Sequence, residues 1–206
     1  MRNRGSAGIA RRRKRQSGTE FIEFALSMLL LFPIMMWMII LGLNLGRGVR
    51  VAQLARDTGS MYARGVDFSA TANQDIVVRL NNGMGMTRTG GTGVVVLSKV
   101  TYIPASSCTG IPSCNSNKYV VVQRLTIGDS SLYTSQVGPT GTVTLDSHGN
   151  VANTMTDPNA VSANFSTILT LSANEFAYVT EAFFPSVDLT ALGAPSGSGV
   201  VSRSVF

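Results

Sequence analysis

Two glutamates, Glu20 and Glu23, lie at the edge of a long apolar stretch, where a charged side chain is unfavourable and its presence needs a physical explanation. They lie in segment 18–24, which reads GTEFIEF and leads directly into the uncharged stretch. A carboxylate at the centre of a bilayer costs about 2.5–3.5 kcal/mol on insertion scales, and less near the bilayer surface. Both glutamates would be tolerated among headgroups at a helix N-terminus, where the helix dipole favours acids. The alternative is that Glu23 meets a positive partner inside the membrane.

A free α-amino group is one such positive partner, and the sequence offers a way to make it. Cleavage after Gly18 would leave Thr19 as the first residue and Glu23 as the fifth residue of the new chain. Gly18 has no side chain to obstruct a protease. Five consecutive basic residues at 11–15 precede it. Each would contribute about 1 kcal/mol at an anionic inner leaflet.

The apolar stretch that must position these groups runs from Phe24 to Leu43 without a charge. A helix of this length spans about 30 Å, the thickness of the hydrocarbon core. A secretory signal has a shorter apolar region that ends in a small-residue cleavage motif, and no such motif follows here. The basic residues before the stretch outnumber Arg47 and Arg50 after it. This predicts a cytoplasmic N-terminus and an exported C-terminal region.

The helix is predicted to continue from the apolar stretch to about Ala63. One set of residues recurs at spacings of three and four, and a second set shares another face, which is typical of an amphipathic helix. One set is apolar or small and the other is charged; they are Val51, Leu54, Ala55, Thr58, Met61 and Tyr62, and Arg47, Arg50, Asp57 and Arg64. The helix should therefore pack its apolar face against the exported domain or against a neighbouring subunit.

The rest of the chain predicts a small antiparallel sheet, and so an α+β fold. A short helix is expected at 72–80, followed by a glycine-rich loop at 83–93 whose spacing fits neither common phosphate-binding motif. Strands are expected at 94–103 and 119–127 as a hairpin, with further strands at 141–145, 164–172 and 175–185. Residues 186–206 are expected to be loosely ordered. The late aromatic residues are expected in the sheet core, or alternatively on a recognition surface; they are Phe176, Tyr178, Phe183 and Phe184.

The two cysteines, Cys108 and Cys114, lie in the loop of the expected hairpin. With His148 they cannot make a four-ligand zinc site, so no metal is expected. Outside the cytoplasm they should form a disulfide, and in a reducing compartment they would remain free thiols.

Charge and side-chain inventory argue against nucleic acid binding and catalysis. Residues 1–17 hold seven of the 17 basic residues and no acid, which leaves ten basic against eleven acidic residues in the remainder. A nucleic-acid-binding surface would place its basic residues on the folded domain. No nucleophile with a nearby base is evident. We therefore expect a protein that is not an enzyme and that has no cofactor and no small-molecule substrate.

The junction resembles the class III signal of type IV pilin-like proteins. Segment 19–26, TEFIEFAL, and segment 53–65, QLARDTGSMYARG, are similar to those of TadE-like pseudopilins of the Tad/Flp pilus. Asp57 and Ser60 depart from the expected residues around Gly59, and Pro33 lies deeper in the helix than expected. The resemblance implies a leader at 1–18, a pilin helix at 19–65 and an exported β-rich domain at 66–206. It also implies cleavage between Gly18 and Thr19 by a prepilin peptidase, with Glu23 and Phe24 acting in assembly.

The same resemblance implies partners and a role. The partners would be other pilin or pseudopilin subunits and the inner membrane, and the role would be structural, in pilus assembly, adhesion and surface colonisation. Two alternatives remain open. One is a single-pass anchored periplasmic binding or sensing domain. The other is a type II secretion pseudopilin, although Thr19 replaces the phenylalanine usual at its first mature position.

Overall fold

The computed structural model describes residues 17–138, 142–186 and 198–206. The chain divides into two compact units, residues 1–45 and 46–206. One α-helix, α1 (Ser17–Ala63), supplies the described part of the first unit and residues 46–63 of the second. The predicted leader, apart from its last two residues, lies outside the described residues. The predicted α+β class is confirmed.

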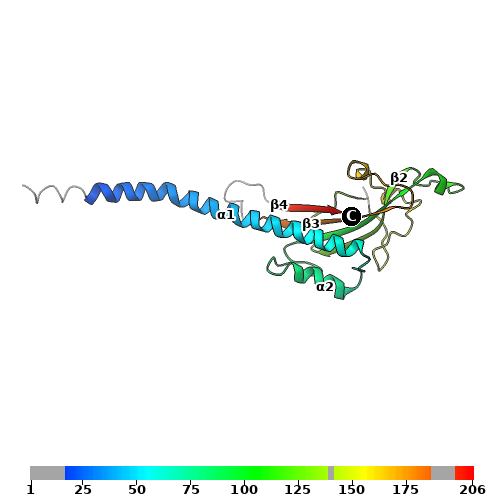
Figure 1. Cartoon of the computed structure of the whole chain (residues 1–206), viewed down its shortest axis with the longest axis horizontal. Coiled ribbons are helices and arrows are strands. Elements are labelled where there is room, and N and C mark those ends of the chain that lie inside the picture. The colour runs from blue at the N-terminus through cyan, green and yellow to red at the C-terminus, as the bar shows by residue number, and fades with distance from the viewer. Residues whose placement is uncertain (1–16, 139–141, 187–197) are drawn as a thin grey trace, which may run out of the picture. The chain divides into compact units, whose positions relative to one another are not determined.

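Four strands form one antiparallel sheet in the second unit (Figure 1). They are β1 (Val94–Ile103), β2 (Lys118–Gly128), β3 (Phe176–Pro185) and β4 (Gly199–Val205), in the order β2-β1-β3-β4. The predicted hairpin is confirmed, because β1 and β2 pair from Val94 with Gly128 to Ile103 with Lys118. The strand predicted at 175–185 is also confirmed, as β3.

One face of the sheet is covered by residues 46–63 of α1 and by α2 (Thr71–Leu80), which lies beside that part of α1 in Figure 1. The apolar face predicted for α1 is buried: Val51 and Ala55 are fully buried, and Leu54 and Tyr62 are 4% exposed. The two helices and the sheet share one core cluster. Its members are Val51, Leu54, Ala55, Tyr62, Phe68, Val77, Met84, Met86, Val95, Leu97, Leu125, Ile127, Ala182 and Phe184.

β4 runs alongside α1 in the same direction within this unit. A Cβ built on Gly48 would lie 3.8 Å from Val200, and one built on Gly59 would lie 2.5 Å from the ring of Phe206. The second distance is shorter than real Cβ contacts allow. Helix and strand therefore approach closely at Gly59, and only a residue without a side chain fits there. This explains a glycine in the interior of α1, although glycine is less favourable than alanine in a helix by about 1 kcal/mol.

Gly59→Ala is expected to destabilise the second unit by about 1–3 kcal/mol, because the added methyl group overpacks the contact with Phe206 and Thr180. The matched control is Gly46→Ala, at another helical glycine with nothing within 4 Å of its Cβ position. That change should stabilise by about 1 kcal/mol. Thermal unfolding of the full chain in detergent measures both. Equal shifts of the two variants in the stabilising direction would contradict the close approach.

The other face of the sheet is covered by irregular chain from the β2–β3 connection. Val137, Val151, Ala160, Phe165 and Leu171 lie on the core side of this connection. They pack on the outward residues of the sheet, which include Val100, Val121, Ala177 and Val179. The second unit is thus three layers: helices, sheet and a long covering loop.

Three predictions for the later chain need correction. Segment 164–172 is not a strand: it holds a short 3₁₀ turn, η3 (Phe165–Thr167), in which Phe165 is fully buried on the core side of the covering loop. Residues 142–145 of the strand predicted at 141–145 form no strand, and only Leu145 makes a bridge, to Val151; residue 141 lies outside the described residues. Of residues 186–206, the segment predicted to be loosely ordered, residues 199–205 instead pair with β3 as β4, and residues 187–197 lie outside the described residues.

The late aromatic residues divide between core and surface. Phe184 and Phe183 are buried, at 1% and 8% exposure, as predicted. Phe176 is 46% exposed, which corrects the prediction for that ring. Phe176 and Tyr178 instead lie close to the ammonium group of Lys99, with the Phe176 centroid 4.2 Å away. A cation over an aromatic face is favourable, so an exposed ring here still has a defined partner.

Candidate functional site

The predicted junction residues all lie at the beginning of α1. Gly18, Thr19, Glu20, Glu23 and Phe24 are helical and exposed. A Cβ placed on Gly18 would meet nothing within 4 Å. No described residue therefore covers the peptide bond after Gly18. Glu23, five residues further along the helix, is exposed on its surface.

The apolar stretch after the junction is exposed at every residue except Ile40, which is partly buried. In its most apolar 18-residue window, the mean hydropathy is 2.5 and none of the residues is buried. A helix that is apolar on all sides is found inside a membrane or in the core of a larger assembly. The large side chains left exposed are Phe21, Ile22, Phe24, Leu26, Met28, Leu29, Leu30, Leu31, Phe32, Ile34, Met35, Met36, Trp37, Met38, Ile39, Leu41, Leu43 and Leu45.

Within the described residues, α1 is the one helix long and apolar enough to cross a membrane. Its first polar side chain after the apolar stretch, Asn44, donates a hydrogen bond from Nδ2 to the carbonyl of Ile40 at 3.0 Å. The amide thus satisfies a donor within its own helix. The first unit is consistent with membrane anchoring.

The cysteines meet at the tip of the β1–β2 hairpin. Cys108 and Cys114 form a disulfide with Cα atoms 5.7 Å apart. The next residue, Asn115, is buried and holds the tip against residues 154–157: its Nδ2 donates to the carbonyls of Thr154 at 3.0 Å and Asp157 at 2.8 Å. The disulfide closes a hairpin tip that is also fixed to the covering loop.

A series of hydrogen bonds connects α1 to the sheet and to a turn at 146–150. The Tyr62 hydroxyl donates to Oε1 of Gln123 at 2.8 Å, and Nε2 of Gln123 donates to the carbonyl of His148 at 2.8 Å. Burial raises the pKa of Tyr62 well above its ordinary value, so this hydroxyl remains a donor at physiological pH. The series of polar contacts continues from His148 to Ser69, whose Oγ lies 2.9 Å from Nδ1 of His148.

The Ser69–His148 contact places a hydroxyl beside an imidazole, which the sequence alone did not indicate. A serine nucleophile also needs a group that orients the histidine through its other ring nitrogen. The neighbouring carboxylates are engaged elsewhere: Asp67 accepts from the Ser69 backbone N–H, and Asp146 accepts from the backbone N–H groups of His148 and Asn150. The contact therefore acts to join the 67–70 loop to the 146–150 turn.

Acidification is expected to destabilise the second unit through three turn carboxylates. Hydrogen bonds from Ser69, Ser131 and Asn150 hold the pKa values of Asp67, Asp129 and Asp146 below the ordinary value of an aspartate. Because the folded values are depressed, this stability is present above about pH 5 and is lost as the pH falls through them. Thermal unfolding midpoints recorded from pH 7 to pH 2.5 measure the loss.

The triple variant Asp67→Asn, Asp129→Asn and Asp146→Asn is the control for this pH dependence. It keeps an acceptor oxygen at each turn and removes the titration. Its unfolding midpoint should change less with pH than that of the unaltered chain. The same slope in both proteins would assign the acid sensitivity to other groups.

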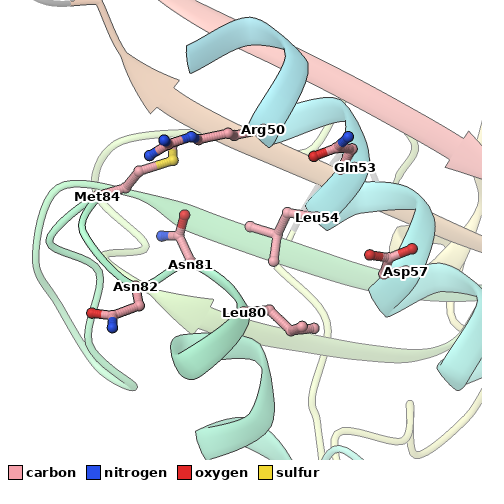
Figure 2. Close-up of a pocket in the computed structure, with 8 residues that line it drawn as sticks. All are labelled: Arg50, Gln53, Leu54, Asp57, Leu80, Asn81, Asn82 and Met84. Atoms are coloured by element: carbon pink, nitrogen blue, oxygen red, sulfur yellow. The ribbon is translucent and has the colours of Figure 1, made fainter. Parts of the chain in front are cut away.

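A pocket of about 360 Å³ lies between α1 and the loop that follows α2 (Figure 2). The α1 residues Arg50, Gln53, Leu54 and Asp57 line one side, and Leu80, Asn81, Asn82 and Met84 line the other. Asn81 is only 4% exposed, and its Nδ2 has no hydrogen-bond partner among the described residues. The sequence placed Arg50 and Asp57 on the charged face of the helix but gave no sign of a pocket beside them.

A buried charged cluster on the other side of the sheet was also missed. Glu181 in β3 is 1% exposed and lies 2.7 Å from Nη2 of Arg203 in β4. Its carboxylate also accepts from Tyr133 at 3.1 Å and from the hydroxyl of Ser135. Burial lowers the pKa of neighbouring Arg124, which donates to Ser98 at 3.3 Å and to Ser135 at 3.2 Å. These bonds fasten the covering loop to the sheet.

The burial of Glu181 could have been predicted from the alternation of inward and outward residues along its strand. Glu181 shares a face with Ala177, Val179 and Phe183, all buried. A charged residue at an inward position is found buried only with partners. The described residues hold no group of three His, Cys, Asp or Glu side chains arranged to bind a metal.

Comparison with known proteins gives no relative for this chain. No protein-family model, curated protein or solved structure matches it. The class defined by fold and site is therefore a coarse one: an α+β protein with one N-terminal helix suited to membrane anchoring.

Proposed function

We propose that the chain is a structural minor pilin or pseudopilin of the TadE-like kind, processed by a prepilin peptidase and acting in assembly of a Tad/Flp-type pilus, in adhesion and in surface colonisation. The observation that carries this proposal is the junction at 18–24 in its helical setting. Glu23 is an exposed acid at the beginning of a helix whose apolar window has no buried residue.

The proposed topology follows from charge and from the cysteines. The basic segment at 11–15 remains in the cytoplasm, the apolar stretch crosses the inner membrane, and residues 46–206 lie in the periplasm or outside the cell. The disulfide between Cys108 and Cys114 supports such an oxidising location, because disulfides persist outside the cytoplasm.

Assembly would use the two exposed features of α1. After cleavage, the amino group of Thr19 neutralises Glu23, in the same chain or in an adjoining subunit, and lowers the cost of an acid in hydrocarbon. The apolar side chains then pack against the helices of other pilin subunits. The unit at 46–206 would be displayed on the assembly.

The test is mass spectrometry of the membrane-bound protein from strains with and without the prepilin peptidase. We expect the mature N-terminus at Thr19 only in the strain that has the peptidase, and the intact leader in the other strain. An intact leader in both strains would overturn the proposal. A Gly18→Leu variant is a useful control, since it should keep its leader even where the peptidase is active.

A second candidate is supported by the pocket beside Arg50. A single-pass anchored binding domain would also carry an exposed apolar helix, and the unpartnered Nδ2 of Asn81 is a feature expected of a ligand site. In that case Glu23 would be incidental. Its replacement separates the two candidates, as argued in the Discussion.

A further inference from the structure

The pocket of Figure 2 contains a hydrogen-bond donor that the described chain does not use. Nδ2 of Asn81 is buried and without an acceptor, which is destabilising unless something else supplies one. Figure 2 shows the amide group of Asn81 directed into the space below Arg50. The amide oxygen and nitrogen can exchange places by a half-turn of the amide, so either position can present the donor.

Arg50 supplies a cation to the same space. Its guanidinium makes no hydrogen bond or ion pair with a described residue, whereas Nη1 of nearby Arg47 donates to the carbonyl of Pro185 at 2.6 Å. A guanidinium group matches the oxygens of a phosphate or carboxylate in a two-bond arrangement. Arg50 and Asn81 together thus favour an oxyanion at this end of the pocket.

The opposite end of the pocket has the opposite charge. Asp57 follows Arg50 by seven residues, two turns along the same helix, and Gln53 and Leu54 lie between them. A doubly charged phosphate would be repelled by Asp57. A zwitterion with a singly charged phosphodiester and an ammonium group satisfies both ends, and its short carbon linker would contact the apolar side chain of Leu54.

The position of Arg50 in the sequence indicates where such a zwitterion comes from. It follows Leu43, the end of the apolar stretch, by seven residues, which correspond to about 10 Å of helix. Headgroups occupy roughly the first 5–7 Å beyond the hydrocarbon core, within reach of an arginine side chain. We propose that this pocket binds the phosphoethanolamine headgroup of a membrane lipid, with its phosphate at Arg50 and Asn81 and its ammonium group at Asp57.

This proposal needs the membrane anchor but not the cleavage after Gly18, so it can fail while the pilin proposal survives. The test uses the purified full-length chain in detergent, titrated calorimetrically with glycerophosphoethanolamine, glycerophosphoglycerol and inorganic phosphate. Glycerophosphoethanolamine should bind most tightly. Arg50→Gln should weaken it about tenfold or more, which is the loss expected for a charge-assisted hydrogen bond, and Asp57→Asn should abolish the preference over glycerophosphoglycerol.

The matched control is Arg64→Gln, at an exposed arginine in the turn that follows α1 and outside the pocket; it should leave binding unchanged. Unfolding midpoints of all variants identify any loss caused by misfolding. In bilayer discs, native mass spectrometry should find phosphatidylethanolamine retained by the unaltered chain and lost from Arg50→Gln. Equal losses in Arg50→Gln and Arg64→Gln, or tighter binding of inorganic phosphate than of glycerophosphoethanolamine, would overturn the proposal.

Discussion

Glu181→Ala is expected to destabilise the second unit by about 3–5 kcal/mol, the loss typical of removing one partner from a buried ion pair. Glu181 is 1% exposed, and its carboxylate accepts hydrogen bonds from β4 and from the covering loop. Without it, Arg203 loses its ion-pair partner and Arg124 loses a nearby opposite charge. Thermal and urea unfolding of the full chain in detergent measure the change.

The control for Glu181 is the other ion pair of the described chain, between Arg88 and Asp75. Its atoms are 3.2 Å apart, but both side chains are nearly half exposed, so Asp75→Ala should cost less than about 1 kcal/mol. A second variant, Glu181→Gln, keeps the shape and removes the charge. If all three variants lost the same small amount, the cluster would not be what holds β4 and the loop to the sheet.

Glu23→Gln is expected to abolish assembly of the proposed pilus, or to reduce it to a small fraction, while leaving the second unit folded. The change removes the charge that we propose pairs with the new amino group of Thr19. Surface piliation and recovery of the protein in sheared filament fractions measure assembly. The unfolding midpoint should not change, because Glu23 lies outside the unit at 46–206.

Glu20→Gln is the matched control for Glu23. Both acids lie on the first turns of α1 and both are exposed, so they differ only in their position relative to the new N-terminus. Under the pilin proposal Glu20→Gln assembles nearly as well as the unaltered chain. Normal assembly of Glu23→Gln would favour the anchored binding domain, and equal defects in both variants would assign the effect to helix-end charge in general.

The features that could be predicted from the sequence are those that short, periodic patterns of apolar residues indicate. The three- and four-residue spacing of Val51, Leu54 and Tyr62 predicted the buried face of α1, and all three are buried. The Val- and Ile-rich segments on either side of the cysteines predicted the β1–β2 hairpin. In these segments the local pattern and the tertiary contacts agree.

The features that the sequence did not predict depend on distant partners. The Gly- and Ser-rich setting of residues 199–205 favoured loose order, yet the open edge of β3 pairs with them. Segment 164–172 has strand-like residues, but Phe165 is needed to fill the core under the covering loop, and the chain turns there instead. The pocket at Asn81 depends on how the loop after α2 meets α1, which no local pattern records.

The alignment of β4 with α1 has a mechanical consequence. A pulling force that enters the second unit at Gly46 is transmitted along a helix whose contacts with Val200 and Phe206 are spread over its length. Such contacts are loaded together in shear, not peeled apart one after another. Extraction of the helix from the sheet would have to break the Tyr62–Gln123 hydrogen bond and the core packing at the same time, so the unit should resist tension along this axis better than tension across it.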